Sequence, residues 1–148
     1  MRKLVSFLVL LTMGYVTYGQ QGSRGDGSQV APQLVEQKFQ SEFPKATQVS
    51  WERKDNRYLA RFIMNGYQMY ALYTSAGLWL FTDIKVPIEK VPAKAKQHCS
   101  TNFGDFSIVR SGFHDSMNSG SYYVLTIKKN GVMKKAKYDE NGNFLGLN

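Results

Sequence analysis

Residues 58–80 read YLARFIMNGYQMYALYTSAGLWL, and residues 123–145 read YVLTIKKNGVMKKAKYDENGNFL. At an offset of 65 residues, seven positions of these stretches are identical: Tyr58/Tyr123, Asn65/Asn130, Gly66/Gly131, Ala71/Ala136, Tyr73/Tyr138, Gly77/Gly142 and Leu80/Leu145. A fainter match precedes them at an offset of 60 residues, as Phe43/Phe103 and Val49/Val109. Self-similarity at a fixed spacing indicates a structural unit that is used twice. We therefore expect one domain, residues 30–148, built from two repeats, residues 30–86 and 87–148.

Each half begins with a pattern typical of an amphipathic helix. In the first half, apolar residues recur at spacings of three and four from Ala31 to Phe43, and Pro44 ends the pattern. In the second half, the apolar stripe comprises Val91, Ala95, Cys99 and Phe103. Cys99 is the single cysteine of the chain, which excludes an internal disulfide, and its place on the stripe predicts a buried thiol.

Each half continues with strand patterns. Asn65-Gly66 and Asn130-Gly131 each separate two alternating runs, which is typical of a β-hairpin with a two-residue turn. Further strands are expected at residues 47–54, 78–84, 106–114 and 143–147. Because a unit of about 55 residues is marginal on its own, the two halves are expected to join. The predicted fold is α+β, with one antiparallel sheet of about eight strands and both helices on one face.

The two-residue turns also sort the side chains of each hairpin into two faces. The repeated Tyr and Ala identities fall on a mainly apolar face, which we expect to pack against the helices. The other face differs between the halves, and we take its residues as candidates for partner binding: Leu59, Arg61, Ile63, Tyr70, Leu72, Thr126, Lys128, Lys135 and Lys137. An exposed face that mixes apolar groups with cations suits protein binding, and a merely solvated face is the alternative. For Trp51 and Trp79, core and surface positions both remain open.

The beginning of the chain predicts export. Arg2 and Lys3 precede the apolar run 4–16, and small residues lead up to Gly19, so residues 1–19 resemble a signal peptide cut after Gly19. A membrane anchor is the alternative, although a bilayer span needs about 20 apolar residues. Residues 20–29 lack apolar side chains, which is typical of a flexible leader. We expect a periplasmic or secreted protein without a later transmembrane segment, and its formal net charge of +8 favours acidic partners.

Residues typical of catalysis or metal binding are sparse. His98 and His114 fall in different predicted elements, with no Cys or carboxylate at ligand spacing near either one. No Gly-rich phosphate loop is present. We therefore expect no catalytic residue, no cofactor and no metal. An enzyme of unknown chemistry remains an alternative, for which a deep polar pocket around His114 would be the sign.

One family shares several of these motifs. The series Phe39…Phe43-Pro44-x-Ala46-x-x-Val49-x-Trp51, Tyr58-x-Ala60-x-Phe62, Asn65-Gly66 and Ala71-x-Tyr73-x-x-x-Gly77 resembles the PepSY-like family of exported Bacteroidetes proteins. That family is described as similar to β-lactamase inhibitor protein. The resemblance covers about residues 34–147 and implies a concave sheet that can hold another protein. The resemblance does not extend to an acidic residue with an inhibitory role. Asp115 is the single acidic residue of an apparent insertion, residues 114–121, and we do not assign it that role.

The function that these observations favour is that of an exported, non-catalytic binding module. Its open sheet face would bind a protein or peptide of the cell envelope, with inhibition as one use of that binding. The alternative is a binder of anionic glycan or lipid surfaces, whereas export argues against nucleic acid. Outer strands of an open sheet can pair between chains, so we expect a monomer or a weak dimer.

Overall fold

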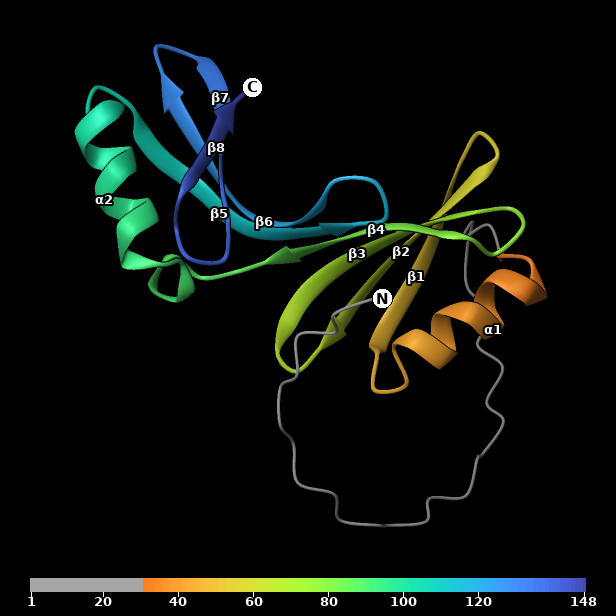
Figure 1. The fold of residues 1–148 in the computed structure, drawn as a ribbon. Coiled ribbons are helices and arrows are strands. Elements are labelled where there is room, and N and C mark those ends of the chain that lie inside the picture. The colour runs from red at the N-terminus through yellow and green to blue at the C-terminus, as the bar shows by residue number, and fades with distance from the viewer. Residues whose placement is uncertain (1–30) are drawn as a thin grey trace, which may run out of the picture.

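The computed structural model describes residues 31–148, so the predicted signal peptide and leader lie outside the described residues. Figure 1 shows a helix followed by four strands, and then the same order again. The first set is α1 (Gln33–Glu42), β1 (Thr47–Lys54), β2 (Arg57–Met64), β3 (Tyr67–Thr74) and β4 (Trp79–Lys85). The second set follows a short 3-10 helix, η1 (Ile88–Lys90), and comprises α2 (Ala93–Asn102), β5 (Ser107–Ser116), β6 (Gly120–Lys129), β7 (Val132–Tyr138) and β8 (Phe144–Leu147). Among residues 31–148, neither helix has the length and apolar character that crossing a bilayer requires.

The strands form one eight-stranded antiparallel sheet in the order β1 to β8. The ladder between β4 and β5 joins the two halves, with Phe81 opposite Ser116 and Lys85 opposite Gly112. Figure 1 shows α1 along β1–β4 and α2 along β5–β8. The predicted α+β fold with one continuous antiparallel sheet is therefore confirmed.

Both Asn-Gly turns close their hairpins as predicted. Asn65 and Gly66 have φ angles of 52° and 78°, and Asn130 and Gly131 have φ angles of 50° and 83°. Two consecutive positive φ angles define the tight turn whose twist matches that of the flanking strands. The turns place Met64 opposite Tyr67 and Lys129 opposite Val132, so the predicted register holds along both hairpins.

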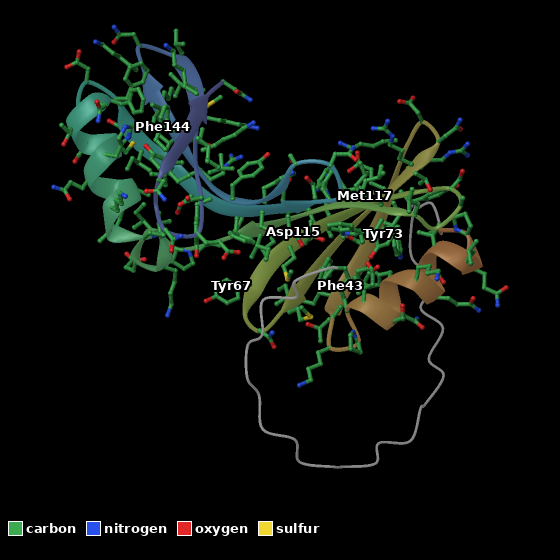
Figure 2. All side chains as sticks on the ribbon, viewed as in Figure 1. Phe43, Tyr67, Tyr73, Asp115, Met117 and Phe144 are labelled. Carbon is green, nitrogen blue, oxygen red and sulfur yellow. The ribbon has the colours of Figure 1, made fainter. Side chains whose placement is uncertain are left out.

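The two helices pack on the same face of the sheet, each over its own core. Met69, Ile84, Phe113, Tyr123 and Tyr138 are successive cross-strand partners from β3 to β7, and directly opposite residues share a face. The first core comprises Ala31, Val35, Phe39, Ala60, Phe62, Met69, Ala71, Tyr73 and Trp79. The second comprises Val91, Ala95, Cys99, Leu125, Ile127, Ala136 and Tyr138. Figure 2 shows Phe43 and Tyr73 in the first half and Phe144 in the second.

Both Trp side chains and the Cys99 side chain lie between the sheet and the helices. Trp79 is buried, and its Nε1 donates a hydrogen bond to Thr82 Oγ1 at 2.8 Å. Trp51 is half-buried, with its ring centroid 5.3 Å from that of Phe39. Cys99 is 2% exposed, which confirms the predicted buried thiol.

The segment 114–121 corrects the expected end of a strand. We expected β5 to end at residue 114, yet the strand continues to Ser116, and Asp115 pairs with Ser121 on β6. The additional residues therefore lengthen a hairpin, and their outer edge pairs with β4. Asp115 lies opposite Thr82 on the helix-covered face and accepts a hydrogen bond from Ser121 Oγ at 2.8 Å. It does not contribute to the open face.

Candidate functional site on the open sheet face

The sheet face opposite the helices carries a row of polar and aromatic side chains. Arg61, Tyr70, Asp83, His114 and Tyr122 are successive cross-strand partners from β2 to β6. The ring centroid of His114 lies 4.9 Å from that of Tyr122. The row therefore crosses the junction between the two halves without interruption.

A hollow of about 500 Å³ lies beside this row. Gly112 lines it, with Lys85 opposite on β4 and Val124 opposite on β6. Because glycine has no side chain, the sheet surface is open at that point between larger neighbours. The hollow is lined by residues of β3 to β7 and by the residue after β8: Tyr70, Asp83, Ile84, Lys85, Arg110, Ser111, Gly112, Phe113, His114, Tyr122, Val124, Thr126, Lys135, Lys137 and Asn148.

Positive charge predominates around the hollow. The side chains of its lining include four cations, Lys85, Arg110, Lys135 and Lys137, and one carboxylate, that of Asp83; Asn148, whose backbone is hydrogen-bonded to that of Lys135, lines it as well. The Asp83 carboxylate is already engaged, because its Oδ1 lies 2.6 Å from His114 Nδ1. Lys85 Nζ donates to Gln68 Oε1 at 2.5 Å. An anion that entered the hollow would therefore meet an excess of cations.

Four of the nine predicted partner-binding residues line the hollow, namely Tyr70, Thr126, Lys135 and Lys137. Three others lie on the open face outside it: Arg61, Ile63 and Lys128. Leu59 and Leu72 also belong to this face by register, but their side chains are only 9% and 7% exposed. Leu59, Leu72 and Phe81 are consecutive cross-strand partners that shield one another, so the two leucines offer a partner little surface.

Five of the residues that line the hollow were missed by the sequence prediction. Gly112, His114 and Arg110 come from β5, whereas Asp83 and Lys85 come from β4. The open-face prediction covered only the two Asn-Gly hairpins, whose register follows from local turns. The face of the five missed residues follows from the pairing of β4 with β3 and of β5 with β6, and the register of both pairs shifts, between Leu72 and Tyr73 and between Ile108 and Arg110.

The Asp83–His114 pair bears on the enzyme alternative. The hollow around it is open to solvent, since the Asp83 side chain is 51% exposed. Within residues 31–148, no hydroxyl or thiol forms a hydrogen bond with His114, whose recorded partner is Asp83. No group of three or more His, Cys, Asp or Glu residues in the described part of the chain could hold a metal. The pair therefore links β4 to β5 and orients the imidazole, without an adjacent nucleophile to activate.

The other histidine lies on the opposite face of the sheet. His98 Nδ1 is 3.2 Å from the hydroxyl of Tyr138, and its ring stacks on Phe144 at 4.7 Å. Burial raises the pKa of the neighbouring Cys99 thiol, which keeps it protonated and unreactive. Burial likewise raises the pKa of the Tyr138 hydroxyl. Because the sheet separates His98 from His114, the two histidines cannot form one site.

Comparison with known proteins places this architecture among solved folds. No protein-family model and no curated protein matches the chain, so the PepSY-like resemblance stays a prediction. A BLIP-like protein from Bacteroides fragilis is 18% identical, with a TM-score of 0.73, over 82% of this chain and 88% of that chain. A DUF2874 family protein from Bacteroides ovatus is 19% identical, with a TM-score of 0.71, over 81% and 88%.

A third similar structure, from Bacteroides eggerthii, is 18% identical, with a TM-score of 0.70, over 81% of this chain and 89% of that chain. Its description assigns it provisionally to the periplasm. Identities this low establish the fold alone. This chain therefore has the BLIP-like fold, with one open antiparallel sheet and two helices on one of its faces.

Proposed function

We propose that the protein is an exported, non-catalytic binding module that holds a protein or peptide against the open face of its sheet. The observation that carries the proposal is the cationic, aromatic-walled hollow at the centre of that face. Its volume of about 500 Å³ falls within the range typical of ligand sites, roughly 300–1,000 Å³. Both helices cover the opposite face, so no helix of the described residues 31–148 lies between this face and a partner.

The side chains of the open face suit a protein partner. Tyr and Arg are enriched at the energetic centres of protein interfaces, and Tyr70, Tyr122 and Arg110 all line the hollow. Tyr70 on β3 and Tyr122 on β6 are both half-buried, and each lies on a strand that is hydrogen-bonded to its neighbours in the sheet. Their rings are therefore restricted before a partner arrives. Preorganised groups lose less conformational entropy on binding, which favours affinity.

Two further observations support the non-catalytic and exported parts of the proposal. Among residues 31–148, the hydrogen-bond partner of His114 is the Asp83 carboxylate, and no hydroxyl or thiol is hydrogen-bonded to the imidazole. The signal-peptide pattern of residues 1–19 agrees with the provisional periplasmic assignment of the Bacteroides eggerthii structure. The first observation supports binding without catalysis, and the second supports a location within or beyond the cell envelope.

A binder of anionic glycans is the second candidate, because the same four cations would attract sulfate or carboxylate groups of a polysaccharide. Contacts of this kind between exposed charges weaken as salt screens them. Retention on an anionic glycan that falls steeply with ionic strength, without any captured protein, would favour this candidate.

Site-specific photocross-linking in the native envelope tests the proposal. We expect p-benzoylphenylalanine at Tyr70 or Lys128, on the open face, to form adducts with a protein. The matched controls carry the same group at Gln37 of α1 or Gln97 of α2, both exposed on the helix side. Equal adducts from both faces, or adducts from the helix side alone, would show that the open face is not the binding surface.

A further inference from the structure

We infer that the hollow is a carboxylate-binding subsite, and that its occupant is an acidic segment of a peptide or protein. An Asp or Glu side chain of the partner lies among Arg110, Lys135 and Lys137, and an adjoining apolar residue contacts the ring of Tyr122. This inference rests on the proposed function and specifies the chemistry of its partner.

The register of the sheet directs three cations at one point. Arg110, Thr126 and Lys135 are successive partners on β5, β6 and β7, and Val124 pairs with Lys137 in the neighbouring row. Neighbouring strands lie about 4.8 Å apart, so Arg110 and Lys135 start about 10 Å apart on either side of Thr126. Their long side chains can both reach a single anion above Thr126, and its hydroxyl can donate to the same anion.

Among residues 31–148, the absence of an ion pair is shared by three cations of the hollow and by exposed lysines elsewhere, such as Lys45 and Lys90; the three of the hollow differ in lining one common space. Outside it, Arg61 lies 2.5 Å from a Glu52 oxygen, and Lys129 lies 2.7 Å from an Asp105 oxygen. Within residues 31–148, no carboxylate side chain forms an ion pair with Arg110, Lys135 or Lys137.

Arg110 and Lys135 therefore have no carboxylate side chain as partner within residues 31–148, whereas Lys137 Nζ lies 3.0 Å from the side-chain amide of Asn148. Lys137 is held over the Tyr122 ring, with Nζ 5.2 Å from the ring centroid. A carboxylate placed there offsets the mutual repulsion of the cations and accepts charge-assisted hydrogen bonds from them.

The walls favour a peptide over a polyanion. Asp83 contributes a negative charge to the lining and would repel a second anionic group close to the first. Tyr70, Tyr122 and Val124 contribute apolar surface, which a sulfate-rich or phosphate-rich chain cannot use. One carboxylate with an apolar neighbour matches both features, and that combination is ordinary in a peptide.

Fluorescence anisotropy with two peptides tests the inference on the full chain as purified after export. The first probe is fluorescein-labelled Gly-Tyr-Val-Glu-Val-Tyr-Gly, and the second has Gln in place of Glu. We expect the Gln peptide to bind about tenfold more weakly, which is the effect of losing one charge-assisted interaction. In an Arg110→Gln/Lys135→Gln variant, binding of the Glu peptide falls by about the same factor, and binding of the Gln peptide hardly changes.

The matched control is Lys45→Gln/Lys90→Gln, which removes the same charge from exposed positions outside the hollow and leaves binding of both peptides unchanged. Equal affinity for the two peptides, or no binding of the Glu peptide at millimolar concentration, overturns the inference. A competition experiment adds a sulfated heparin fragment or inorganic phosphate at concentrations below the dissociation constant of the Glu peptide. Displacement of that peptide would assign the hollow to a polyanion and would overturn the inference.

The cross-linking experiment separates failure of this inference from failure of the proposed function. If open-face adducts persist in the Arg110→Gln/Lys135→Gln variant, the partner does not need the hollow, and only the carboxylate subsite is wrong. If no protein adduct forms on the open face of the unmodified protein, the proposed function itself fails. Circular dichroism and urea unfolding of each variant verify that its fold is intact.

Discussion

The two halves of the molecule share an element order but fill their cores differently. Tyr73 and Tyr138 occupy matching strand positions, and both are completely buried. On the helices, however, Phe39 of the first half corresponds to Cys99 of the second. On the sheet the change is reversed, since Ala60 of the first half corresponds to Leu125 of the second.

At these two positions, a smaller helix residue in the second half is accompanied by a larger sheet residue. Cores tolerate such compensated changes, because total volume and apolar pattern matter more than the identity of each residue. On the open face no such compensation operates: the first half carries Leu59, Ile63 and Leu72, and the second carries Thr126, Lys135 and Lys137 at hairpin positions. Packing against the helices constrains one face of the sheet, and the residues of the other face are free to diverge.

The largest expected difference in stability between the halves concerns Phe39 of α1 and Cys99 of α2, the buried helix residues at matching positions. Phe39→Ala should lower the free energy of unfolding by about 3–5 kcal/mol, since it removes a buried ring that contacts Phe43, Trp51 and Phe62. Cys99→Ala removes one sulfur atom and should cost only about 1 kcal/mol. Urea-induced unfolding measures both. Equal losses of unfolding free energy would mean that the second core is packed as tightly against its helix as the first. If Phe39→Ala does not fold, Phe39→Leu provides the same comparison with a smaller loss of stability.

The next effect concerns two glycines at matching positions. Gly77 and Gly142 have φ angles of 75° and 81°, so any side chain there is strained. A Cβ on Gly142 would also lie 2.8 Å from the backbone nitrogen of Ala95, whereas one on Gly77 would meet the Leu34 and Lys38 side chains at 3.3 Å and 3.2 Å.

Flexible side chains can move aside, and helix backbone cannot. Gly142→Ala should therefore cost about 2–4 kcal/mol and Gly77→Ala about 1–2 kcal/mol, as measured by thermal or urea unfolding. Gly66→Ala is the control for strain alone, because it has a positive φ with no atom within 4 Å of the added Cβ. A Gly77→Ala loss that matches or exceeds the Gly142→Ala loss would contradict the assignment of the tighter contact.

The smallest effect is a pH dependence that belongs to the second half. Burial raises the pKa of the Cys99 thiol, so the unfolded chain releases this proton at a lower pH than the folded chain does. The free energy of unfolding should therefore fall as the pH rises above about 9, the ordinary value for the thiol. Cys99→Ala should make this decline shallower between pH 8 and pH 10, and Ser100→Ala, at the exposed neighbouring position, should not. Identical slopes for all three proteins would show that the thiol does not contribute.

Much of the fold could be predicted because its decisive features are local. Asn-Gly turns need only their own backbone geometry, so the positions of Met64 opposite Tyr67 and of Lys129 opposite Val132 followed from neighbouring residues. The candidate site was predicted only in part. Tyr70, Thr126, Lys135 and Lys137 lie on these hairpins and were found, whereas Arg110, Gly112 and His114 lie on a strand whose pairing with β4 no turn specifies. Leu59 and Leu72 were assigned to the correct face, but their burial depends on Phe81 from a third strand.

Local sequence patterns were enough to predict the two hairpins, the apolar face that each presents to a helix, and the buried position of Cys99, because each depends on short-range periodicity or on one turn. The pairing of β4 with β5 depends on the complete fold, and so do the contact of Asp83 with His114 and the open sheet surface at Gly112. That pairing joins strands separated by η1 and α2, so its register follows from how both cores pack and not from any local residue preference. The hollow lies at the junction of two similar halves, and neither half contains it alone.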